Sequence, residues 1–129
     1  VIEAAGFTDL RENLRQPGGV AVDYAARDRK GGLWFFEVAG GFTSHRGGLK
    51  RAEVLWKVLG KAAVLREVDK GTPIVLLTTE APVPGSSGAE TLRQVTGPGK
   101  LIHAVIKMQE ESGLDRLRIL CQGDSVQRN

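Results

Sequence analysis

The sequence predicts an α/β sandwich with a mixed β-sheet. Three observations lead to this fold class. A hairpin pattern covers residues 20–39, where two runs rich in Val, Trp, Phe and Tyr flank a polar turn that ends in Gly31-Gly32. Apolar residues then recur with a helical period over 49–68, and the continuous apolar run PIVLLTT follows at 73–79. Such a run is typical of a strand buried on both faces of a sheet.

Glycine pairs mark the joints between the elements. Residues 2–15 carry Ile2, Ala5, Leu10 and Leu14 among charged residues and end at Pro17-Gly18, which predicts a first helix. The remaining elements are, in order, strands at 20–27 and 33–39, a glycine-rich loop at 40–48, a helix at 49–68, a strand at 73–79, a helix at 89–95, a strand at 101–108 and a last strand at 116–121.

Composition narrows the class of protein. The chain has 129 residues, 41% of them hydrophobic and 26% charged, which fits one globular domain over 1–129. The apolar run at 73–77 is too short to span a membrane, and the single Cys121 leaves no internal disulfide, so we expect a soluble, cytoplasmic protein with no membrane contact. The only methionine is Met108, and we therefore expect the chain to be part of a longer protein.

The hairpin turn fixes a predicted register. If the loop is centred near Lys30, opposing residues have numbers that sum to 60, so Ala25 faces Phe35 and Asp23 faces Glu37. Two carboxylates directly opposite each other on one sheet face repel. A divalent cation such as Mg²⁺ or Mn²⁺, which prefers oxygen ligands, would convert this repulsion into ligation. The alternatives are that both are solvated surface charges, or that the register slips so that they never meet.

These segments resemble the core of the PD-(D/E)XK nucleases, a superfamily that includes restriction endonucleases. The matching pieces are VAVDY, WFFEVAG, the helix RAEVLWKVLGKAAVL and PIVLLTT, which together span residues 20–79. The resemblance implies a restriction endonuclease-like mixed β-sheet flanked by helices. That core has one further strand before the Asp-bearing strand, and the sequence pattern does not locate it.

Residue by residue, the resemblance implies that Asp23 and Glu37 bind Mg²⁺ or Mn²⁺ and that the backbone carbonyl of Val38 completes the metal shell. DNA is the implied substrate, and a homodimer or the remainder of a larger nuclease is the implied assembly. The family motif has a lysine two residues after the Glu, where this chain has Ala39. A replacement lysine must therefore come from another element.

Three lysines of the 49–68 helix are candidates for that role. Lys50, Lys57 and Lys61 fall within about 40° on a helical wheel, forming a basic stripe opposite the apolar one. We expect Lys57 or Lys61 to act in catalysis, provided that the helix lies tilted at the edge of the sheet, and Lys50 and Arg51 to contact DNA. The alternative is that these lysines only solvate the outer face of an amphipathic helix.

The loop FTSHRGG leaves the sheet directly after the Glu37 strand. Ser44, His45 and Arg46 offer a hydroxyl, an imidazole and a guanidinium, which suit phosphate oxygens, and His45 could serve as a general base. The alternative is a loop whose Thr, Ser and Gly serve only to cap and turn into the next helix.

The predicted function is a metal-dependent DNA endonuclease. The formal charge of +3 is compatible with a polyanionic partner without requiring one. The competing hypotheses are a catalytically degenerate module that binds DNA or a protein, and an unrelated α/β domain in which the acidic pair is accidental.

Overall fold

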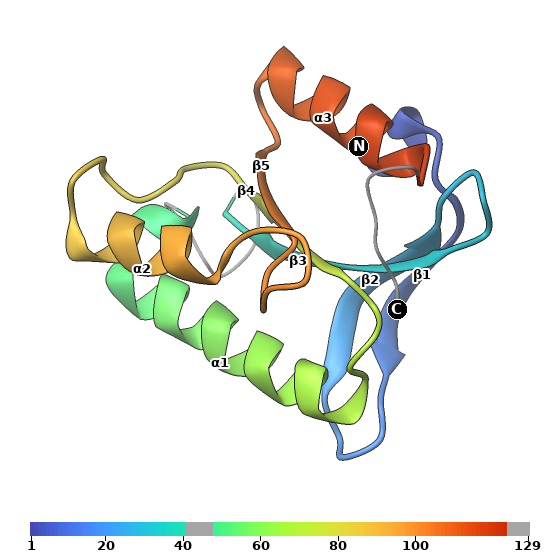
Figure 1. Ribbon diagram of the computed structural model, residues 1–129, viewed down its shortest axis with the longest axis horizontal. Helices are drawn as coiled ribbons and strands as arrows, with labels where there is room; N and C mark the ends of the chain where they lie inside the picture. Colours follow the sequence, from blue (N-terminus) through green and yellow to red (C-terminus); the bar gives the residue numbers. More distant parts are fainter. Residues whose placement is uncertain (41–47, 124–129) are drawn as a thin grey trace.

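The computed structural model describes residues 1–40 and 48–123 of the chain. Its centre is a five-stranded mixed sheet with the strand order β1-β2-β3-β4-β5 (Figure 1). The strands are β1 (Thr8–Arg15), β2 (Ala21–Arg27), β3 (Leu33–Ala39), β4 (Ile74–Thr78) and β5 (Ala104–Lys107). The first three strands are antiparallel, and β3, β4 and β5 run parallel. The α/β class and the mixed sheet are therefore confirmed.

Helices cover both faces of the sheet, as Figure 1 shows. One face carries α1 (Ala52–Val68), which follows the short 3₁₀ turn η2 (Gly48–Lys50), and α2 (Ser87–Val95); their apolar residues share a core with Phe35, Ala39 and Leu76. The other face carries the 3₁₀ turn η1 (Glu3–Ala5) and α3 (Glu111–Cys121), packed around Trp34 and Phe36. All five residues of β4 are buried, as its continuous apolar run predicted.

The predicted helix at 2–15 is wrong. Only η1 is helical there, and most of the segment is strand β1, which pairs with β2 and precedes the Asp-bearing strand. Leu10 and Leu14 have helical spacing, yet they pack on opposite faces of the sheet. Positive φ angles at Asp9 (55°) and Asn13 (49°), with a register shift near the first, bend the strand and change its facing. Asp and Asn adopt this conformation more readily than other residues with side chains.

The predicted strand at 116–121 is also wrong, because these residues belong to α3. Leu117, Ile119 and Cys121 alternate as a strand would, but Ile119 is exposed. The buried positions are instead Gly113, Leu117, Leu120 and Cys121, which share one face of a helix.

The C-terminal half of α1 is tied to the neighbouring loops by one side chain. The Arg66 guanidinium donates to the backbone carbonyls of Lys70, Thr72, Lys100 and Leu101, each at 3.1 Å. These loops lead into β4 and β5, so the helix has a fixed position above the sheet.

Among the described residues, none of the helices has the length and apolar character needed to span a membrane.

Two helical glycines give a matched test of the packing of α3. A Cβ atom at Gly113 would lie 2.2 Å from the Lys107 carbonyl oxygen, whereas one at Gly60 of α1 would meet no atom within 4 Å. We expect Gly113→Ala to lower the free energy of unfolding by about 1–3 kcal/mol, through forced separation of α3 from β5. Gly60→Ala should raise it by about 0.5–1 kcal/mol. Urea unfolding checks both values, and an unaltered Gly113→Ala protein would contradict the packing described.

Candidate functional site

The pairing of β2 with β3 follows the predicted register. The opposed pairs are Tyr24 with Phe36, Ala25 with Phe35, Ala26 with Trp34 and Arg27 with Leu33. The turn that sets this register is held by the buried carboxylate of Asp28, which accepts hydrogen bonds from the backbone N–H groups of Lys30 and Gly32 and from Trp34 Nε1. The hairpin pattern predicted the polar turn but not this role of Asp28.

Beyond the pair Tyr24 and Phe36, hydrogen bonds between backbone N–H groups and carboxylate side chains join β2 to β3. The backbone N–H of Asp23 donates to Glu37 Oε2 at 2.8 Å. The backbone N–H of Val38 donates to Asp23 Oδ2 at 3.0 Å. Each strand thus binds the carboxylate of the other, and this reciprocal pair fixes both acidic groups between β2 and β3.

The remaining oxygen of each carboxylate faces a lysine of α1. Lys61 Nζ lies 3.3 Å from Asp23 Oδ1 and 2.5 Å from Glu37 Oε1. Because both oxygens contact one nitrogen atom, they lie within about 6 Å of each other, in agreement with the prediction that Asp23 and Glu37 face each other. We call Asp23, Glu37 and Lys61 the triad.

The three side chains of the triad differ in how far they are buried. The Glu37 side chain is only 3% exposed, against 35% for Asp23 and 30% for Lys61. Burial is the largest effect on Glu37 and raises its pKa above the ordinary value, although hydrogen bonds from Lys61 and from Asp23 N–H oppose the shift. Burial lowers the pKa of Lys61, but the two carboxylates together outweigh it, and the net pKa is raised.

The triad borders a small hollow of about 280 Å³ whose other lining residues are Val38, Lys57 and Val58. Lys57 is exposed, and in the described part of the chain no hydrogen bond or ion pair holds its side chain. Lys61 reaches the carboxylates because it stands at the margin of the helix's buried face, beside Ala62 and one turn after Val58. The other predicted contact residues do not line this hollow or lie outside the described residues.

Lys50 pairs with Glu80 at 3.9 Å, and Arg51 pairs with Glu53 on the first turn of α1. The predicted basic stripe is therefore divided: Lys61 is brought to the carboxylates, Lys57 to the rim of the hollow, and Lys50 to a separate surface ion pair. Ser44, His45 and Arg46 lie outside the described residues.

The two carboxylates offer oxygen ligands of the kind that a hard divalent cation prefers. In the structure Asp23 Oδ1 and Glu37 Oε1 converge on Lys61 Nζ, so an ion bound by these two oxygens would share the site with the ammonium group or displace it. Mg²⁺ commonly binds through one or two carboxylates and completes its shell with water and substrate phosphate. Residues 1–40 and 48–123 contain no group of three or more Asp, Glu, His or Cys side chains that could hold a metal ion. The fit therefore depends on two carboxylates and on the neighbouring backbone at Val38.

Ala39 stands where the resemblance to the nuclease core implies a lysine; it is 2% exposed and packs in the core beneath α1. It shares a sheet face with Glu37, two residues earlier, so that face is occupied by a methyl group at 39 and by a lysine entering from α1.

No family model, curated protein or solved structure matches this chain.

Replacing Lys61 tests how much the buried charge of Glu37 depends on it. We expect Lys61→Met to lower the free energy of unfolding by about 1–3 kcal/mol near neutral pH, because it leaves a buried carboxylate without its cation. Without Lys61 the pKa of Glu37 rises further above its ordinary value, because the neighbouring cation no longer offsets burial. Stability is then lost as the pH rises through this raised pKa, so the deficit is larger at about pH 8 than at about pH 5.

Two further variants control this experiment. Lys57→Met removes a lysine from the same hollow without touching either carboxylate and should change stability by less than about 0.5 kcal/mol. Lys61→Met combined with Glu37→Gln removes the buried charge and should lose the added pH dependence. Equal pH profiles for the Lys61→Met and Lys57→Met proteins would contradict the described coupling.

Proposed function

We propose that this domain is a metal-dependent nuclease that hydrolyses phosphodiester bonds of DNA. The observation that carries the proposal is the triad: two carboxylates fixed on adjacent strands, with a lysine from a neighbouring helix within contact distance of both. Carboxylates, a cation at a developing charge and an open hollow for the substrate are the parts that phosphodiester hydrolysis requires.

Each residue has a proposed role. Asp23 and Glu37 would hold Mg²⁺ or Mn²⁺ with the Val38 carbonyl, and the bound ion supplies an acidified water and a positive charge at the phosphate. Lys61 would replace the lysine that the nuclease motif has at the position of Ala39. Its partly exposed ammonium group would donate to the water or to a phosphate oxygen. Lys57 on the rim, with Lys50 and Arg51 at the start of α1, would contact the DNA backbone, as would Ser44, His45 and Arg46.

One observation favours a second candidate function. Lys61 provides a positive charge beside both carboxylates without any metal, and the described residues offer no third acidic ligand. A degenerate module would keep the triad as a structural ion pair and use Lys57 and the basic start of α1 to bind DNA or an acidic protein surface. Cleavage assays separate the two functions.

The first test is cleavage of supercoiled plasmid. We expect nicking to require Mg²⁺ or Mn²⁺ and to stop in excess EDTA, because the carboxylates act through the ion. Asp23→Asn and Glu37→Gln should abolish cleavage while DNA binding is equal or tighter, since each removes a negative charge near phosphate. Cleavage that survives in EDTA, or in both variants, would overturn the proposed mechanism.

The second test assigns the lysines. Lys61→Met should lower the cleavage rate by about 10²-fold or more with little change in DNA affinity, because its ammonium group acts at the reacting centre. Lys57→Met should mainly weaken binding and reduce the salt dependence of the affinity by about one unit, as expected for a phosphate contact. Single-turnover rates and salt-titrated binding curves measure both effects. Wild-type protein that binds DNA but never cuts it would support the degenerate module.

A further inference from the structure

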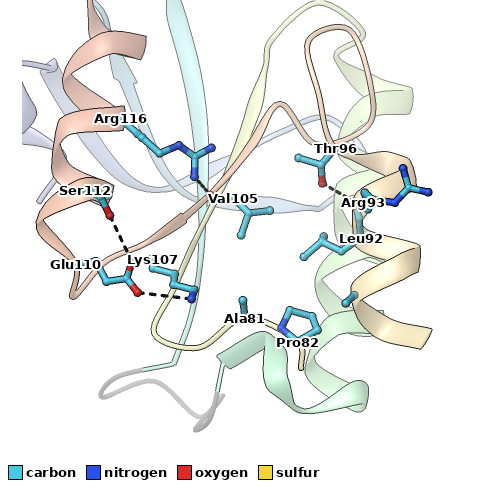
Figure 2. A pocket seen from close by; sticks show the side chains of 12 residues that line it. Ala81, Pro82, Leu92, Arg93, Thr96, Val105, Lys107, Glu110, Ser112 and Arg116 are labelled. Carbon is cyan, nitrogen blue, oxygen red and sulfur yellow. Dashed lines mark hydrogen bonds and ion pairs between the residues drawn. The ribbon is translucent and has the colours of Figure 1, made fainter. Parts of the chain in front are cut away.

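A second hollow lies on the far edge of the sheet. It encloses about 480 Å³ between α2, α3 and the edge strand β5, and it shares no lining residue with the hollow at the triad (Figure 2). This volume falls within the range of roughly 300–1,000 Å³ typical of small-molecule sites. The nuclease proposal leaves the hollow without a role.

The side of the hollow formed by α2 and the loop before it is apolar. Pro82, Ala89 and Leu92 line it, and Val105 of β5 lies between this side and α3. Most polar groups at the rim already have partners within the protein: the Thr96 hydroxyl donates to the Leu92 carbonyl, and the Ser112 hydroxyl donates to Glu110. A ligand is therefore offered a mainly hydrocarbon surface.

The charges around the hollow leave one cation for a ligand. Lys107 pairs with Glu110 at 3.5 Å, and Arg93 pairs with Glu90. Arg116 has no acidic partner in the described part of the chain, and its Nη1 donates to the Val105 carbonyl at 2.9 Å. Figure 2 shows this side chain reaching from α3 toward Val105. One hydrogen bond thus orients the guanidinium and leaves its other N–H groups able to donate.

We propose that this hollow binds a small aliphatic carboxylic acid, with its carboxylate on Arg116 and its hydrocarbon body against Leu92, Pro82 and Val105. A single unpaired cation matches a singly charged head, and a planar carboxylate matches the guanidinium geometry. A doubly charged phosphate would lack a second free cation among the described rim residues. The proposal is independent of the nuclease function.

The experiment uses octanoate as the probe, with octan-1-ol and acetate as controls, and follows backbone amide shifts by NMR. Octanoate should shift the amides of Leu92, Val105 and Arg116, and octan-1-ol should bind at the same place about 10-fold more weakly, because it lacks the charged head. Acetate, which lacks the hydrocarbon body, should give no saturable shift. Octanoate shifts confined to other surfaces, or equal binding of octanoate and octan-1-ol, would overturn the proposal.

Variants separate the charge from the hollow. Arg116→Met should reduce octanoate affinity to that of octan-1-ol while octan-1-ol binding is unchanged, which also shows that the hollow remains intact. Arg118→Met is the matched control, since Arg118 lies on the same helix, pairs with Asp115 and does not line this hollow. Ala89→Phe should fill the apolar side and abolish binding of both probes. Wild-type octanoate affinity in the Arg116→Met protein would refute the proposed contact.

Discussion

Two hydrogen bonds from backbone N–H groups to carboxylates, formed between β2 and β3, determine the rest of the site. Where Asp23 and Glu37 stand, each strand donates an N–H to the acidic side chain of the other. This arrangement orients both carboxylates and leaves one oxygen of each directed at a common point. Two acidic groups held so close on a covered sheet face require a nearby cation, and Lys61 provides it. The position of α1 is therefore part of the site's chemistry.

Several contacts keep α1 where this cation is needed. Buried side chains, including Leu55, Leu59 and Leu65, hold the helix against the sheet, and Arg66 binds carbonyls of the loops before β4 and β5. Lys61 lies at the edge of the buried face, between Leu59 and Leu65 in the sequence. Its ammonium group thus has a defined place while about a third of the side chain remains exposed.

The site was more predictable than parts of the fold around it. The turn at Asp28 to Gly32 fixed the hairpin register, and extending that register one pair past Tyr24 and Phe36 placed Asp23 beside Glu37 from local sequence alone. Strand β1 was not predicted because its apolar spacing is helical. Its apolar pattern also gives no sign of the left-handed residues Asp9 and Asn13, at which the strand changes its facing. The helical period places Lys57 and Lys61 on the same side of the helix and does not distinguish them. Only the position of α1 on the sheet decides that Lys61 contacts the carboxylates.

The entry of the triad's lysine from α1 rather than from β3 has a physical rationale. Ala39 is packed in the core beneath α1, so a lysine there would have to bury much of its stem between the layers. Entry from α1 lets Lys61 contact both carboxylates and still face the open hollow. With both carboxylates ionised, two negative charges face one positive charge, and the triad keeps a net negative charge. Lys61 already occupies the point on which the two oxygens converge, so this residual charge favours a further cation beside the triad, while the exposed Lys57 on the rim favours an anion. Under the proposed function, a phosphate joined to a divalent ion would satisfy both.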